Sequence, residues 1–402
     1  MKLEKGQKNS ILNYQENNII NMKKLKICFV GSNPSFNGGV SVFKKNLIEY
    51  LKSVNRETDI TWVYGGEKNK SYSAGGISYI EIKSTKIPFL NDIIFNRKVK
   101  SYLRENTFDI INSHGVWGYW LKDYKKKPGQ KIVHTYHGSA YYFLKNSTMR
   151  FGIIKRIILL PLLLFGYYLE MPPIKKADKI ICVSEKVKKQ LRTLYKINRD
   201  MEVIRTGVNL EGFKIRNTKI IKDRLDLDKD KTYGLYIGRG GFWTKGLDRA
   251  INLSEEIHHL NKNFGLIIIG ADKRKVGHLL NKKFILFLEN VPREKIPYYY
   301  NASNIFFCLS RYEGGAPTLV VSEAMASGCL IVCAKSAEPE IITNGKNGLI
   351  LDSFGKHDAN KIVNLLENET KKKRIILNSI KEVKKLSLEK WGKKIFEEFI
   401  GK

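Results

Sequence analysis

Short apolar runs recur along the chain and alternate with longer amphipathic segments. In the first half they cover residues 25–30, 60–64, 109–112, 131–136, 178–183 and 202–205. In the second half they cover residues 232–238, 264–270, 284–290, 304–310, 329–334 and 348–352. Nearly continuous apolar strands that alternate with helices are typical of parallel sheets covered on both faces. The pattern predicts an α/β protein with two doubly wound, Rossmann-like domains facing a central cleft, which is the default ligand site.

The domain boundaries follow from the polar segments. A polar stretch at 215–231 separates the two series of strands and predicts a first domain at 22–214 and a second at 215–385. Residues 386–402 have the spacing of an amphipathic helix, which we expect to return toward the first domain. Residues 1–21 lack the apolar core of a signal peptide and are expected to form a flexible extension.

Length, composition and cysteine usage are typical of a two-domain cytoplasmic protein. The chain has 402 residues, with 43% hydrophobic and 27% charged positions, and is longer than a single hydrophobic core usually supports. All five cysteines lie in apolar runs and lack a metal-binding spacing: Cys28, Cys182, Cys308, Cys329 and Cys333. We therefore expect reduced core thiols, a cytoplasmic location and no metal site.

The net charge of +32 and one apolar segment raise the question of a membrane surface. Residues 22–214 hold 35 lysines and arginines against 15 acidic residues, which indicates either an acidic partner or a lysine bias on a solvated surface. The apolar segment 157–169 is 13 residues long, below the ~20 needed to span a bilayer, so it is not expected to cross. Two interpretations stay open: a buried helix, or a helix with basic flanks that lies partly in a membrane surface.

Loops that follow predicted strands carry the candidate chemistry of the first domain. Gly38 and Gly39 precede a helix and would let main-chain amides approach a phosphate, although an ordinary strand-to-helix turn has the same pattern. His137 lies at the end of the fourth strand, where side chains reach the cleft, and is the catalytic candidate. His134 lies within that strand and is expected to pack in the core, whereas His114 either faces a sugar or packs.

Two cations mark the first loop of the second domain. Arg239 directly follows a strand, and Lys245 precedes a helix predicted to begin near Leu247. Cations on a glycine-rich loop at a helix N-terminus form an anion clamp that suits a diphosphate. A solvated loop with incidental charges is the alternative.

A second loop, RYEGGAP at 311–317, leads into a helix predicted from about Thr318 to residue 327. Consecutive main-chain amides there can bind an anion, and the candidates are Gly314, Gly315, Ala316, Pro317 and Thr318. Glu313 and Glu323 can accept hydrogen bonds from hydroxyl groups. A nucleotide sugar offers both a diphosphate and hydroxyls.

At these residues the chain resembles the retaining glycosyltransferases of family 4, which have the GT-B fold. The motifs that carry the resemblance are Gly38-Gly39, His137-Gly138, ADKIICVSE (177–185), VIRTGVNLEGF (203–213), Arg239 to Gly246, YEG…P…EAMASG (312–328) and PEIITNGKNGLIL (339–351). Their order and spacing cover nearly all of 22–402. The interval between Glu313 and Glu323, with nine residues between them, is longer than is usual in the family, as is the interval from Arg239 to Lys245.

The resemblance implies a retaining hexosyltransferase that uses a nucleoside-diphosphate sugar and needs no metal or other cofactor. Arg239 and Lys245 would neutralise the departing diphosphate, and Glu323 would hold the nucleotide ribose. His137 would lie near the donor sugar and the reaction centre, and Glu313 would take the position of the family's first glutamate. The first domain would present the acceptor, and closure of the cleft would exclude water.

The acceptor and the setting stay open at this point. A lipid-linked glycan, a polysaccharide precursor and a small soluble molecule are all compatible with the pattern, and the enzyme is expected in the cytoplasm, including the inner face of an anionic membrane. A nucleotide-sugar epimerase or hydrolase of the same fold and a catalytically inactive donor-binding scaffold are the alternatives. Nucleic acid is not an expected partner, because the basic residues are scattered and no nucleic-acid-binding module is recognised.

Overall fold

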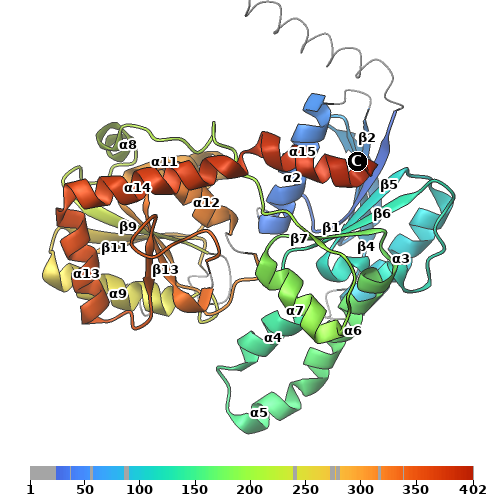
Figure 1. Ribbon diagram of the computed structural model, residues 1–402, viewed down its shortest axis with the longest axis horizontal. Helices are drawn as coiled ribbons and strands as arrows, with labels where there is room; N and C mark the ends of the chain where they lie inside the picture. The colour runs from blue at the N-terminus through green and yellow to red at the C-terminus, as the bar shows by residue number, and fades with distance from the viewer. Residues whose placement is uncertain are drawn as a thin grey trace, which may run out of the picture.

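The computed structural model describes residues 24–36, 38–54, 58–85, 90–238, 242–271, 277, 281–315, 318–337 and 339–401. The chain forms two α/β units that lie side by side in Figure 1, the first in blue and green and the second in yellow to red. Apart from one edge strand, all strands in both sheets pair in parallel. The predicted fold class, two doubly wound parallel-sheet α/β domains, is confirmed.

The first sheet has the strand order β3-β4-β2-β1-β5-β6-β7-β8. Its strands are β1 (Lys26–Gly31), β2 (Asp59–Gly66), β3 (Lys70–Ala74), β4 (Ile77–Lys83), β5 (Ile110–His114), β6 (Lys131–Tyr136), β7 (Lys179–Cys182) and β8 (Glu202–Val203). Its helices are α2 (Gly39–Val54), α3 (Leu90–Glu105), α4 (Ala140–Thr148), α5 (Ile153–Ile158), α6 (Leu160–Lys176) and α7 (Glu185–Tyr195), with a 3-10 helix at Gly115–Asp123.

The second sheet has the order β11-β10-β9-β12-β13-β14. Its strands are β9 (Thr232–Ile237), β10 (Phe264–Ile269), β11 (Ile285–Leu288), β12 (Ile305–Cys308), β13 (Leu330–Ala334) and β14 (Leu349–Leu351). The helices that follow the first domain are α8 (Thr218–Arg224), α9 (Leu247–Leu260), α11 (Ile296–Ala302), α12 (Leu319–Ala326), α13 (Lys356–Glu367), α14 (Glu369–Val383) and α15 (Leu388–Ile400). The polar stretch 215–231 thus contains a helix, α8.

Burial on both faces explains the apolar strand pattern. In β1, Ile27 and Phe29 pack into a cluster with helices α2 and α15, while Cys28 and Val30 join the cluster on the opposite face. Successive side chains of a strand point to opposite faces, so a strand covered on both sides reads as a continuous apolar run. All five cysteines are buried and free, in agreement with the predicted core thiols.

The strand order places the ligand site. β1 lies between β2 and β5, and β9 lies between β10 and β12, so each sheet changes its direction of growth at these strands. In open α/β sheets, ligands bind beyond the carboxyl ends of the strands at such a point. The loops that follow β1, β9 and β12 are therefore the expected walls of the site.

The apolar segment 157–169 is not the buried helix that one interpretation predicted. It spans the end of α5 and the first part of α6, and its Ile157, Ile158 and Leu164 side chains are 66%, 69% and 59% exposed. Its buried residues are Leu163, Gly166 and Leu169. Within the described residues, Ile153–Lys176 is the helical stretch whose length and composition would allow a membrane span.

The last helix of the chain completes the first domain. α15 packs on α2 (Figure 1), and its Trp391 ring meets Phe43 edge to face with ring centroids 4.8 Å apart. A Cβ atom on Gly207 would lie 2.7 Å from the Trp391 side chain, so the chain that leaves the first domain passes directly over this indole. Trp391, at 2% exposure, is thus buried between segments that are far apart in sequence.

Truncation of this side chain should destabilise the first domain. Trp391→Ala should cost about 3–5 kcal/mol, because it leaves a large cavity between α2 and α15. We expect the thermal midpoint of unfolding to fall by roughly 10 °C in calorimetry. Leu377→Ala on α14, where the side chain is 55% exposed, is the control and should leave the midpoint nearly unchanged. Equal midpoints for the two variants would show that α15 is not part of this core.

Candidate active site

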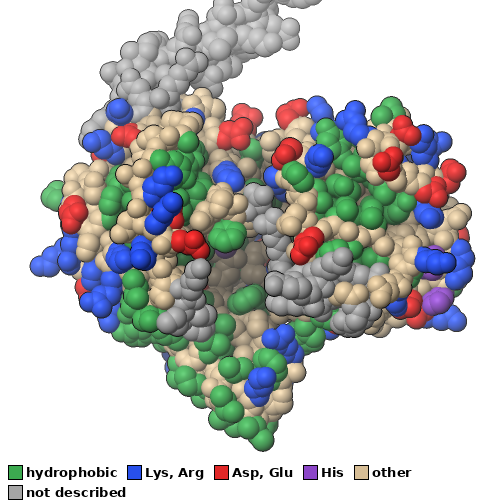
Figure 2. Space-filling model, turned by 180° about the vertical axis from the view of Figure 1, so that it is seen from behind, with side chains coloured by type: hydrophobic (Ala, Val, Ile, Leu, Met, Phe, Trp, Pro, Cys, Tyr) green, Lys and Arg blue, Asp and Glu red, His purple; other side chains and the backbone are tan. Residues whose placement is uncertain are grey.

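A cavity of about 770 Å³ lies between the two domains, beyond the carboxyl ends of β1, β9 and β12. The space-filling view shows the molecule hollowed between its two halves (Figure 2). From the first domain the lining includes Gly38, Gly39, Trp117, His137, Phe143 and Thr206. From the second domain it includes Lys245, Arg293, Glu313, Gly314, Gly315 and Thr318.

The N-terminus of α2 forms one edge of the cavity. A Cβ atom on Gly38 or Gly39 would meet no atom within 4 Å, so these glycines border open space and not a packed wall. The amides of a helix N-terminus are free to bind an anion in such a space.

Two histidines form a hydrogen-bonded pair in the first-domain wall. His114 Nδ1 lies 3.0 Å from His137 Nε2, and His114 Nε2 is buried without a hydrogen-bond partner. A buried N–H group without a hydrogen-bond partner is costlier than a buried lone pair without one. His114 therefore carries its proton on Nδ1, and this N–H donates a hydrogen bond to His137 Nε2. His137 then carries its own proton on Nδ1.

Electrostatics keep this pair uncharged. Burial, and to a lesser extent the neighbouring Lys44 amine, lowers the pKa of His137 to about 3. The same causes, together with the neighbouring His137, hold the pKa of His114 well below its ordinary value. The histidine pair is therefore uncharged at physiological pH. His134, which was expected in the core, is fully buried and forms a hydrogen bond with the Ser113 hydroxyl.

A buried glutamate supports the loop that carries His137. The Glu170 carboxylate, on α6, accepts hydrogen bonds from Ser139 Oγ at 2.9 Å and from the Ala140 amide at 2.5 Å. Ser139 caps α4 by accepting from the Tyr142 amide. Burial raises the pKa of Glu170 to about 7, although these hydrogen bonds oppose the shift. Glu170 thus joins α6 to the cavity wall.

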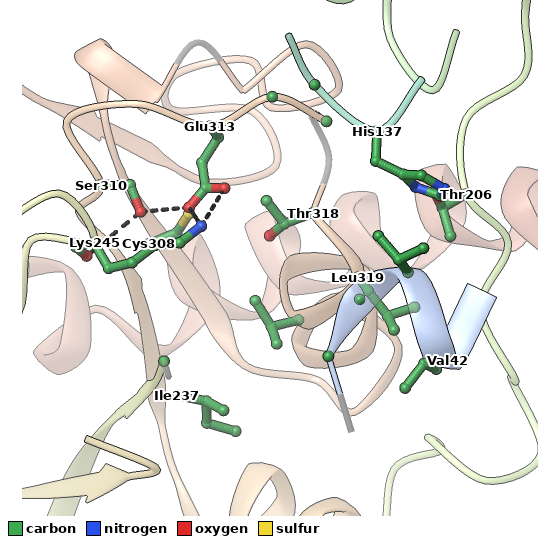
Figure 3. A pocket seen from close by; sticks show the side chains of 18 of the residues that line it. Val42, His137, Thr206, Ile237, Lys245, Cys308, Ser310, Glu313, Thr318 and Leu319 are labelled. Carbon is green, nitrogen blue, oxygen red and sulfur yellow. Dashed lines mark hydrogen bonds and ion pairs between the residues drawn. The ribbon is translucent and has the colours of Figure 1, made fainter. Parts of the chain in front are cut away.

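The second-domain wall holds an ion pair (Figure 3). Lys245 Nζ lies 2.8 and 2.7 Å from the two carboxylate oxygens of Glu313, and Ser310 Oγ donates to the same carboxylate at 2.5 Å. Gly246, with φ +70°, turns the chain after Lys245. A Cβ there would lie 2.0 Å from the Leu309 carbonyl oxygen, so only glycine fits this turn.

The N-terminus of α12 faces the middle of the cavity. Thr318 precedes the first helical residue, and its side chain points into the cavity from below Glu313 in Figure 3. Its hydroxyl oxygen is buried and has no hydrogen-bond partner within the described part of the chain. The helix dipole and free amides at this position favour an anionic ligand group.

Glu323 lies behind this wall, on α12. It is fully buried and forms a bidentate ion pair with Arg293, and it also accepts a hydrogen bond from Tyr300 at 3.2 Å. Burial raises the pKa of Glu323 and the guanidinium opposes this shift. Because arginine stays protonated in proteins, its guanidinium favours the ionised form of the Glu323 carboxylate. Arg293, which lines the cavity, thereby holds Glu323 in place.

The two walls meet backbone to backbone at Gly138 and Gly314. A Cβ atom on Gly314 would lie 2.6 Å from Gly138 Cα and from the His137 carbonyl oxygen. Ser184 Oγ, at the start of α7, donates to the Gly314 carbonyl at 3.0 Å. A side chain at position 314 would therefore force these two backbone segments apart.

A second contact between the domains is ionic. The Glu340 carboxylate accepts hydrogen bonds from Arg205 at 3.0 and 3.2 Å and from the Lys186 amide at 2.8 Å. The N-terminus of α7 is thus capped by a carboxylate from the other domain.

The sequence-predicted residues fall into three groups. Those that line the cavity are Gly38, Gly39, His137, Lys245, Glu313, Gly314, Gly315 and Thr318. Glu323 supports the wall, and Arg239, Ala316 and Pro317 lie outside the described residues. Among the described residues, no group of three histidine, cysteine or acidic side chains is placed to hold a metal ion.

Sequence reasoning missed Arg293 and Glu170. A signal was present for each: Arg293 follows a strand of the second domain, and Glu170 is the first acidic residue after a long stretch without one. Neither signal predicts which residue is bound. Arg293 pairs with Glu323, and Glu170 accepts a hydrogen bond from Ser139, each about 30 residues away in the sequence.

Two protein families match the chain. Residues 37–211 match Glycosyltransferase Family 4, and residues 217–382 match Glycosyl transferases group 1. A glycosyltransferase of Methanocaldococcus jannaschii is 26% identical over 375 residues, which cover 90% of this chain and 95% of that relative. A second glycosyltransferase of the same organism is 28% identical over 299 residues, which cover 69% of this chain and 70% of that relative.

Solved structures share the fold. Sucrose-phosphate synthase from Thermosynechococcus elongatus superposes with a TM-score of 0.75 at 18% identity, covering 94% of this chain and 98% of its own. WaaG, a glycosyltransferase of lipopolysaccharide biosynthesis, has a TM-score of 0.75 at 15% identity, covering 94% and 100%. HepE of Anabaena in complex with UDP-glucose has a TM-score of 0.69 at 16% identity, with the same coverage.

Glu170 should make stability depend on pH. Its folded pKa of about 7 lies above the ordinary value of 4.5, so the folded chain holds this proton more tightly than the unfolded chain. Its stabilising contribution is complete below pH 4.5 and is lost as pH rises through 7, by about 3 kcal/mol in all. Glu170→Gln should remove this component from the free energy of unfolding, measured by denaturant titration from pH 5 to 8.

The control for this measurement is Glu211→Gln, since the Glu211 side chain is 91% exposed. This variant should keep the pH dependence of the wild type. If Glu170→Gln shows the same slope against pH as the wild type, the Glu170 carboxyl does not titrate in this range and the assignment fails.

Proposed function

Because the chain belongs to the glycosyl transferases of group 1, with a first domain of the family 4 type, we propose that it transfers a glycosyl group from a nucleoside-diphosphate sugar to an acceptor with retention of configuration. The observation that carries this proposal is the asymmetry of the cleft. Both walls offer a helix N-terminus, but among the described lining residues the cationic side chains, Lys245 and Arg293, belong to the second-domain wall, whereas the first-domain wall offers uncharged imidazoles. The second-domain wall attracts the anionic donor, and the first-domain wall remains free for the acceptor.

The donor diphosphate binds at Lys245 and the N-terminus of α12 in this proposal, with Arg239 as the second cation. Lys245 is engaged by Glu313 in this structure, so an incoming diphosphate competes with that carboxylate. Two anions cannot share one ammonium without repulsion. Glu313 therefore turns from Lys245 to the hydroxyls of the donor, where a carboxylate accepts hydrogen bonds.

The nucleoside lies deeper in the second domain, near Arg293. The ion pair between Arg293 and Glu323 fixes a carboxylate just behind the wall, in reach of a ribose once the guanidinium shifts. The complex of HepE with UDP-glucose supports a nucleotide sugar as the donor class.

We propose that the transfer needs no metal ion. Arg239, Lys245 and the α12 dipole supply positive charge where the leaving diphosphate develops negative charge, and fixed charges of this kind stabilise a transition state without reorganisation. The neutral His137 can donate a hydrogen bond to a sugar hydroxyl without drawing the diphosphate from its own wall. Contacts such as Ser184 with Gly314 close the cleft and exclude water.

The acceptor enters from the first domain, and we propose a glycan or polysaccharide precursor in the cytoplasm. An epimerase or hydrolase of the same fold would use the same donor but form an isomer or a free sugar. An inactive scaffold would bind the donor without turnover. Product analysis with and without acceptor separates these activities.

The donor clamp has a direct test. In EDTA, the wild type should bind a uridine or guanosine diphosphate sugar saturably in a calorimetric panel. Arg239→Ala and the double variant Lys245→Met with Glu313→Gln should each weaken binding by about tenfold or more, because a charge-assisted contact to phosphate is lost. The double variant avoids a buried unpaired carboxylate, since Glu313 is 7% exposed.

Lys335→Met is the matched control, because the Lys335 side chain is 77% exposed and does not line the cavity. It should bind as the wild type does. Binding that is equally strong in all variants, or absent from the whole panel, contradicts the diphosphate clamp.

A further inference from the structure

A cluster of large apolar side chains is exposed at the far end of the first domain. We call it the apolar tip and define it as Ile153, Ile154, Ile157, Ile158, Leu160 and Leu164, on α5 and the first turns of α6. The four isoleucines are 66–75% exposed. Single exposed apolar residues are common, but a contiguous group of this kind marks an interaction surface.

The apolar tip projects away from the body of the protein. In Figure 1, helices α4, α5 and α6 form an extension below the first domain, with α5 at its end. In Figure 2 the same extension points down below the hollow between the two halves and carries green and blue side chains. No element of the described chain covers the four isoleucines, which are among its most exposed apolar side chains.

The extension is firmly anchored at its base. Between Leu169 and Ile174 most residues of α6 are buried. The Glu170 carboxylate accepts hydrogen bonds from Ser139 and Ala140, and the Tyr136 hydroxyl donates to the Glu170 carbonyl at 2.7 Å. α6 therefore could not cross a bilayer without leaving the first-domain core. The apolar tip can enter a membrane surface only from outside, as a rigid projection.

The charges around the apolar tip have one sign. Between Asp123 and Glu170 the sequence holds eight lysines and arginines and no acidic residue. Lys145, Arg150, Lys155 and Arg156 lie on the extension itself. Arg156 is held by the Phe151 and Met149 carbonyls, at 2.9 and 2.5 Å, so its charge is fixed at the turn before α5.

Position links this surface to the cavity. α4, which forms one side of the extension, contributes Ala140 and Phe143 to the cavity lining, and Glu170 of α6 supports the His137 loop. α4 therefore connects the extension that carries the apolar tip with the first-domain side of the cavity. A partner bound to the apolar tip would lie at the far end of this connection.

We propose that the apolar tip docks the protein on an anionic lipid surface. The isoleucines enter the boundary between headgroups and acyl chains, while the four basic residues of the extension lie at the level of the lipid phosphates. A surface with exposed alkyl groups, basic flanks and no acidic residue fits this occupant better than a second copy of a chain whose net charge is +32.

Docking also narrows the class of acceptor, and this step rests on the proposed function. With the apolar tip in the membrane, an acceptor carried by a lipid reaches the first-domain side of the cleft along α4. We infer that the acceptor is lipid-borne.

Flotation with vesicles tests the docking. The full chain is mixed with vesicles of phosphatidylcholine containing 30% phosphatidylglycerol, and separately with phosphatidylcholine alone. Wild-type protein should float with the anionic vesicles, and Ile153→Glu with Ile157→Glu should bind at least about tenfold more weakly. Lys145→Gln with Lys155→Gln should weaken binding by about fivefold per charge, and added salt should do the same.

The matched control is Ile220→Glu with Leu377→Glu, two side chains 60% and 55% exposed in the second domain. It should float as the wild type does. No binding by the wild type, or equal loss in the control, overturns the proposal. So does a dimer in sedimentation velocity that the tip variant converts to a monomer, since a second copy would then cover the apolar tip.

Donor calorimetry on the tip variant separates this proposal from the proposed function. The tip variant should bind the nucleotide sugar as the wild type does, because the isoleucines lie outside the cavity. Vesicle binding without donor binding would leave the docking intact and remove the proposed function, and the reverse result would remove the docking alone.

Discussion

The close approach of Gly138 and Gly314 is the constraint on which the site depends. The two domains touch there through their backbones, at a separation that leaves no room for a single methyl group. This contact brings the loop after β6, with His137, against the loop after β12, with Glu313. The cavity exists because these loops meet at glycines and the Ser184 and Glu340 contacts hold them together.

Charge is divided unequally across that contact. The second-domain wall carries Lys245, Glu313 and Arg293 as ion pairs, which an anionic ligand can exchange. On the first-domain wall, burial lowers the pKa of His114 and His137 and keeps these imidazoles uncharged. Among the described residues that line the cavity, the lysine and arginine side chains thus lie on the second-domain wall, and this follows from the position of the residues and not from the net charge of the chain.

Most of the fold could be predicted from the sequence, and the exceptions have physical causes. Apolar runs identified β1, β9 and β10 because both sheets are buried on both faces. The strands β3 and β4 were missed. All residues of β3 are exposed, and it pairs only at the sheet edge, antiparallel to β4. Most residues of β4 are only partly buried, so it lacks a continuous apolar run. The apolar segment at 157–169 was ambiguous, since the same composition suits a core or a membrane and only packing decides.

The candidate site was predictable in its parts and not in its pairings. Strand ends and glycines located His137, Lys245 and Glu313, because parallel strands expose their functional loops at one edge. The hydrogen bond of His114 with His137 and the ion pair of Glu323 with Arg293 join residues from separate elements. No spacing in the sequence encodes those distances.

A crystal structure with a bound nucleoside diphosphate would test the central claim most directly. The account predicts the diphosphate between Lys245 and the N-terminus of α12, with Lys245 released from Glu313 and the ribose near Glu323. A nucleotide bound elsewhere, with the ion pair of Lys245 and Glu313 intact, would contradict it.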